Sequence, residues 1–162
     1  MLGLGEDRLS IYLNDHLAAA TAGAGLARRS AASNRSTPHG AVLAAVADEI
    51  AEDRATLMEV MNRLSVGRDR AKLALAWGAE RAGRLKLNGT LLSYSPLSRL
   101  EELEALILGV HGKLALWETL RRTHGGDARL SGIDLDDLVE RARSQRRRLQ
   151  RRHEQAAAEA FA

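Results

Sequence analysis

One stretch of the chain decides the fold: residues 37–64 read TPHGAVLAAVADEIAEDRATLMEVMNRL. Its apolar side chains recur every three or four positions, at Val42, Val46, Ile50, Leu57, Val60 and Leu64. This spacing is typical of an α-helix with one buried face. Thr37 is expected to cap the helix and Pro38 to open its first turn, where a missing N–H costs nothing. His39, at the helix end, is expected to be solvated.

Outward from this stretch, the same periodicity predicts four more helices. They are expected over residues 7–33, over 68–87, from Ser95-Pro96 or the box Ser98-x-x-Glu101 to His124, and from Asp134 into the basic C-terminal region. The breaks between them fall at Asn34-Arg35-Ser36, Gly67, Asn88-Gly89 and Gly125-Gly126. No segment alternates apolar and polar residues as a strand would, so the chain is expected to be all-α.

The lengths of the connections predict the topology. The first two long helices are joined by a few residues, as are the last two, so each pair should be antiparallel. About 30 residues, including the helix expected over 68–87, separate the two pairs. Such a connection can return along the molecule and make the second and fourth helices parallel. The sequence thus predicts a single domain over residues 1–162, a four-helix bundle with an additional helix in its long crossover.

Composition excludes several classes of protein. The 162 residues include no cysteine, which rules out disulfides, thiolate metal sites and cysteine nucleophiles. They also contain no intact catalytic motif. The net charge is only +3, yet seven arginines and no acid lie between Arg141 and Arg152. Without a basic leader or a long apolar run, we expect a cytoplasmic protein with no membrane association.

A few polar residues occur where the periodicity predicts the core. They are His16, Asp53, Glu104 and His111. The predicted topology places them at related heights, and imidazoles and carboxylates are suitable ligands for a divalent ion. A hydrogen-bonded acid–histidine network without metal is the favoured interpretation, because buried charges must be paired. A site for iron, manganese or zinc is the alternative.

Short motifs on four helices carry a family resemblance. Segment 13–19 reads LNDHLAA, segment 48–54 reads DEIAEDR, Glu104 lies on the fourth helix, and segment 140–143 reads ERAR. The chain resembles the ferritin-like superfamily, whose di-iron members take a Glu from helix A, Glu-x-x-His from B, a Glu from C and Glu-x-x-His from D. His16 stands at the first glutamate position, and Glu52 and Arg143 stand at the two histidine positions. The resemblance implies the bundle fold, with its metal centre lost or reduced.

Three functions follow as hypotheses. The leading one is a non-enzymatic structural or interaction module without a cofactor, for which a second copy of the chain is a candidate partner. The alternative is a metal-binding relative with an oxidase or storage role that uses the four core residues. The third is weak, salt-sensitive binding of a polyanion such as nucleic acid through Arg143, Arg147 and Arg151.

Overall fold

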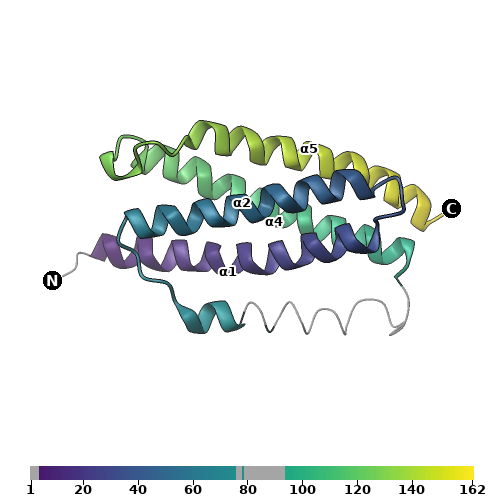
Figure 1. Ribbon diagram of the computed structural model, residues 1–162, viewed down its shortest axis with the longest axis horizontal. Coiled ribbons are helices and arrows are strands. Elements are labelled where there is room, and N and C mark those ends of the chain that lie inside the picture. The colour runs from purple at the N-terminus through teal and green to yellow at the C-terminus, as the bar shows by residue number, and fades with distance from the viewer. Residues whose placement is uncertain (1–3, 76–77, 79–93) are drawn as a thin grey trace.

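The computed structural model describes residues 4–75, 78 and 94–162. All regular structure in those residues is helical, which confirms the all-α prediction. The long helices are α1 (Leu4–Ser33), α2 (Gly40–Arg63), α4 (Pro96–His124) and α5 (Leu135–Ala160), and a 3-10 turn, η1 (Ala128–Leu130), precedes α5 (Figure 1). Residues 70–75 are also helical. Most of the crossover helix predicted over 68–87, and its stop at Asn88-Gly89, lie outside the described residues.

Local capping explains where α4 and α5 begin. The Ser95 side chain accepts a hydrogen bond from the Ser98 backbone N–H, and the Ser98 hydroxyl accepts one from the Ser95 backbone N–H. Asp134 accepts in the same way from the Asp137 N–H. Each bond satisfies a donor that the first turn of a helix leaves without a partner. The Asp134 cap is therefore as predicted, and of the two predicted starts of α4 the structure has the one at Ser95.

The start of α2 differs from the prediction. Its first helical residue is Gly40, and His39 rather than Thr37 is the N-cap. Thr37 stabilises the preceding turn instead, since its hydroxyl donates to the Asn34 carbonyl and accepts from the His39 N–H. A Cβ at Gly40 would lie 2.5 Å from the Asn34 oxygen. The tight reversal between α1 and α2 therefore requires glycine and postpones the helix.

His39 is fully buried, so the expectation that it is solvated is wrong. Its Nε2 lies 3.1 Å from a carboxylate oxygen of Glu159, at the C-terminal end of α5. Arg99, in the first turn of α4, lies 2.7 Å from the same residue. The N-termini of α2 and α4 thus meet one end of α5.

The contacts between helices define the topology. α1 packs on α2, α4 packs on α5, and further contacts join α1 to α4 and α2 to α5. Because α2 and α4 begin at the same end of the molecule, they run in the same direction, as Figure 1 shows. This is the direction that the connection lengths predict. None of the described helices combines the length and apolar character needed to cross a bilayer.

The buried apolar side chains form two clusters, stacked along the bundle. One includes Leu13, Leu57, Leu116 and Leu138. The other includes Ala27, Leu43, Leu103 and Leu149. On α2, α4 and α5 the clusters meet near mid-helix, and the residues at that level are polar.

Candidate functional site: a polar layer in the core

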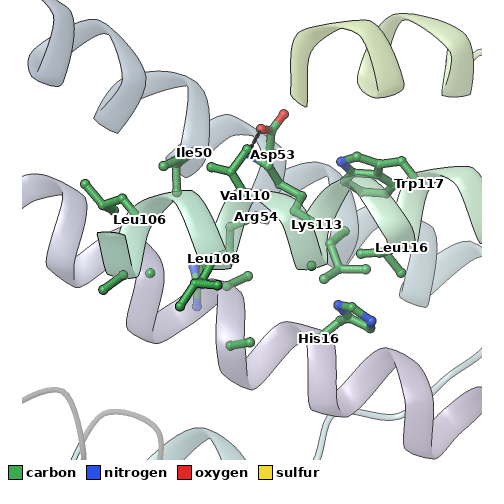
Figure 2. A pocket seen from close by; sticks show the side chains of 17 residues that line it. His16, Ile50, Asp53, Arg54, Leu106, Leu108, Val110, Lys113, Leu116 and Trp117 are labelled. Carbon is green, nitrogen blue, oxygen red and sulfur yellow. Dashed lines mark hydrogen bonds and ion pairs between the residues drawn. The ribbon is translucent and has the colours of Figure 1, made fainter. Parts of the chain in front are cut away.

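Asp53 is the centre of the polar layer. It lies in the middle of α2, is 2% exposed, and faces α4 and α5. The Lys113 ammonium of α4 donates to Asp53 Oδ2, and the two side chains point toward each other in Figure 2. Arg141 of α5 forms an ion pair with the other carboxylate oxygen. Both oxygens of Asp53 are therefore engaged by cations of this chain.

Gln145 of α5 completes the layer and is fully buried. Its carbonyl oxygen accepts from the Lys113 ammonium. Its amide nitrogen donates to Asp53 Oδ2 and to Glu49 Oε2, each at 3.0 Å. One amide thus uses both its donor and its acceptor to join α2 to α4.

Ion pairs between α2 and α5 surround this centre. Arg148 donates to Glu49, and Arg141 Nη1 lies 3.3 Å from Glu52 Oε2. The layer and its rim contain three carboxylates and three cations, counting Glu49, Glu52 and Asp53 against Lys113, Arg141 and Arg148. The formal charges cancel, as burial demands.

Burial also acts on Lys113 itself. Removal from water lowers the pKa of its ammonium, and the Asp53 carboxylate opposes that change. A buried ion pair adds little net stability, because desolvation offsets the attraction between the charges. Its best-attested role is to fix which helices pack together and in which register. We expect the layer to have this role here, because its hydrogen bonds join α2, α4 and α5 at one level.

Of the three central residues, the sequence predicts only Asp53 in the core; Lys113 and Gln145 were not among the predicted core residues. Each of these residues continues an apolar stripe with spacings of three and four: Ile50, Asp53, Leu57 on α2; Val110, Lys113, Trp117 on α4; Ala142, Gln145, Leu149 on α5. A search for polar residues within these stripes could have found all three.

The structure does not bring together the predicted set His16, Asp53, Glu104 and His111. Glu104 is exposed and lies 3.2 Å from His153 Nε2. His111 is also exposed, with its Nδ1 3.5 Å from Arg146 Nη1. The expectation that these two side chains face the core is wrong. The inward face of α4 carries Leu103, Leu106, Val110 and Lys113. Glu104 directly follows Leu103 and His111 directly follows Val110, so each is turned about 100° away from that face.

His16 lies apart from the polar layer. It is half-buried on α1, where its ring contacts the edge of Tyr12 at 4.6 Å between centroids. Across the described ranges, no three histidine, aspartate or glutamate side chains are arranged to hold a metal ion. With Asp53 engaged by Lys113 and Arg141, the described residues do not fit the iron, manganese or zinc site that was the alternative interpretation of His16, Asp53, Glu104 and His111.

The arginines considered for polyanion binding are largely engaged within the molecule. Arg143 lies 2.8 Å from Glu118, and Arg147 lies 2.8 Å from Glu140. The Arg147 hydrogen bond lowers the pKa of Glu140. Arg151 is exposed. Since Arg143 and Arg147 already have carboxylate partners, a phosphate would have to compete with them.

Comparisons of the chain with protein-family models, with curated proteins and with solved structures find no match.

Proposed function

We propose that this chain is a non-enzymatic, ferritin-like four-helix bundle in which an ion-paired layer replaces the metal centre, and that it acts as a structural or interaction module. The observation that carries the proposal is the arrangement at Asp53, where Lys113 and Arg141 engage the two carboxylate oxygens. Bundles of this type build their metal sites from inward side chains of facing helices. In this chain the inward side chains Asp53, Lys113 and Arg141 bind one another instead.

The order and direction of the helices support the ferritin-like part of the proposal. Two antiparallel pairs, α1–α2 and α4–α5, are connected by the long segment between Arg63 and Pro96. A single long crossover between antiparallel pairs is the arrangement of ferritin-like bundles.

The position of Lys113 supports the loss of metal chemistry. Its ammonium is held by a carboxylate oxygen of α2 and an amide oxygen of α5, at the level where the three helices meet. An ammonium in such a place supplies the positive charge that a bound cation would otherwise supply. A divalent ion could bind Asp53 only after displacing both Lys113 and Arg141. Arg141 would keep its ion pair with Glu52, but the largely buried Lys113 ammonium would lose its carboxylate partner.

Metal analysis tests this proposal directly. Protein purified without an affinity tag is dialysed against Fe(II), Mn(II) or Zn(II) and then against metal-free buffer. We expect metal well below one ion per chain, and Fe(II) oxidation no faster than in buffer. Stoichiometric metal that is lost in Asp53→Asn, but retained in the exposed control Asp48→Asn on the same helix, would refute the proposal and favour the metal-binding alternative.

Light scattering tests the interaction role with a second copy of the chain as the candidate partner. A concentration-dependent dimer or larger assembly would support self-association. A monomer at all concentrations would assign the role to a different partner.

A further inference from the structure

A cavity of about 210 Å³ lies between α1 and α4, with α2 as its floor (Figure 2). Its lining is mostly apolar and includes Ala20, Ile50, Leu57, Leu106, Val110 and Leu116. Leu108, at 72% exposure, lies on its wall, so the cavity opens to solvent. An apolar protein cavity of about 150 Å³ is large enough to bind benzene. This one therefore has room for an aromatic ring or a short acyl chain.

Three glycines shape the cavity walls. Gly23 lies on α1, and Gly109 and Gly112 lie on α4. Glycine inside a helix is less favourable than alanine, so its presence calls for a packing or functional reason. A Cβ at any of the three would meet no atom within 4 Å. Close helix packing is thus not the reason, and the effect of these glycines is to keep the space between α1 and α4 open.

Arg54 supplies a positive charge to this apolar space. It reaches from α2 toward α1 (Figure 2). Its Nε donates to Thr21 Oγ1 of α1 at 3.0 Å. Within the residues that the structure describes, no carboxylate pairs with it. Arg141 and Arg148, which are also half-buried on this bundle, each have a carboxylate partner. The guanidinium of Arg54 therefore retains donors for an acidic ligand, and its planar fork suits a carboxylate.

Two aromatic side chains complete the wall. Trp117 is 1% exposed, and its indole N–H has no hydrogen-bond partner among the described residues. His16 lines the cavity from α1, on the N-terminal side of Gly23, and burial lowers the pKa of its imidazole. The cavity thus has large apolar walls and polar groups at few points, which is the usual composition of a small-molecule site.

We propose that this cavity binds a small amphipathic carboxylate, with its ring or short acyl chain between α1 and α4 and its carboxylate at Arg54. Asp53 and Lys113 of the polar layer also line the cavity, but they are paired with each other, whereas Arg54 has no carboxylate partner among the described residues. The proposal involves no metal binding and so does not rest on the proposed loss of metal chemistry.

Binding is tested with hexanoate and octanoate as probes. In a Trp77→Phe background, Trp117 is the sole tryptophan and reports directly on the cavity by fluorescence; calorimetry on the unmodified chain provides a second readout. We expect saturable binding of the acids, at least tenfold tighter than 1-hexanol or 1-octanol of matched chain length. Hexylammonium, which carries the opposite charge, should bind more weakly than hexanol. The absence of saturable binding, or equal affinity for acid and alcohol, would overturn the proposal.

Two kinds of variant separate the carboxylate contact from the apolar contact. Arg54→Gln should weaken binding of the acids at least tenfold and leave binding of the alcohols within twofold. Gly109→Leu should abolish binding of both classes, and Gly23→Leu provides the same test from the opposite wall. Gly126→Leu adds an identical side chain away from the cavity and should change nothing.

Circular dichroism establishes that each variant retains its helices before its affinity is interpreted. Equal weakening of acid and alcohol by Arg54→Gln would contradict the assigned carboxylate position. Undiminished binding by a folded Gly109→Leu or Gly23→Leu protein would contradict the cavity as the site.

Discussion

Asp53→Asn is the substitution that examines the polar layer most directly, because it retains the shape of the side chain and removes its charge. The Lys113 side chain is 13% exposed and would keep its hydrogen bond to Gln145 but lose its nearest counter-charge. Breaking a buried ion pair by removing one partner costs about 3–5 kcal/mol. We expect a loss in the free energy of unfolding of that size at pH 7.

The ordinary pKa of Lys113 sets an upper limit to this loss. The side chain can escape the penalty by releasing its proton, and an unperturbed lysine has a pKa of 10.5. Each pH unit below that value costs about 1.36 kcal/mol, so deprotonation costs about 5 kcal/mol at pH 7 and about 2 kcal/mol at pH 9. The destabilisation should therefore shrink as the pH rises.

The sign follows from proton binding. Loss of Asp53 lowers the pKa of Lys113 in the folded state further below that of the unfolded chain. Between the two values the unfolded chain binds more protons, so the stability of the variant rises with pH relative to the parent. Both proteins are compared at pH 7 and at pH 9.

Urea unfolding followed by circular dichroism measures both quantities. Asp48→Asn is the matched control, since Asp48 is exposed on the same helix, and its effect should stay within about 0.5 kcal/mol. A loss below about 1 kcal/mol for Asp53→Asn at pH 7, or an equal loss at both pH values, would refute the reasoning.

The remaining predictions concern single features. Gly40→Ala should destabilise the protein by about 1–3 kcal/mol, because its Cβ would lie 2.5 Å from a backbone oxygen. Gly109→Ala should stabilise it by up to about 1 kcal/mol, because alanine is the better helix former and its Cβ would meet no atom within 4 Å. Thermal melts that give both changes the same sign would contradict this. Because burial lowers the pKa of His16 below 6.5, the unfolded chain takes up this proton first, and stability should fall as the pH drops through that value. His16→Gln should flatten this pH dependence, and an unchanged slope would contradict it. Any duplex binding by α5 should vanish between low and physiological salt without sequence preference; sequence-specific binding at about 150 mM salt that Arg147→Gln and Arg151→Gln abolish would contradict that.

The secondary structure was accessible from the sequence wherever it depends on neighbouring residues. Caps such as Ser95 and Asp134 satisfy backbone donors three residues away, so their effect can be recognised without a fold. The three-four spacing of apolar residues likewise marks one face of a helix. Thr37 shows the limit of such local reasoning, because its capping side chain serves the turn between α1 and α2 instead of the helix.

The polar residues of the core could be predicted from the sequence only in part. Periodicity placed Asp53 inside the bundle, since the residues three and four positions away are apolar and buried. It placed Glu104 and His111 there as well, although both are exposed. Successive residues differ by about 100° around a helix, so a small error in the assumed rotation of α4 moves a side chain from core to solvent.

By itself, the sequence determined that the chain is helical, where α5 begins, and that short connections pair the helices; for α4 it left two starts open, three residues apart. Tertiary structure alone decided that Asp53 meets Lys113 and Gln145 rather than histidine, and that a cavity remains between α1 and α4. Capping and periodicity act over a few residues of one helix. The rotation of each helix about its axis, by contrast, is set by the packing of all its neighbours, and that rotation decides which side chains meet.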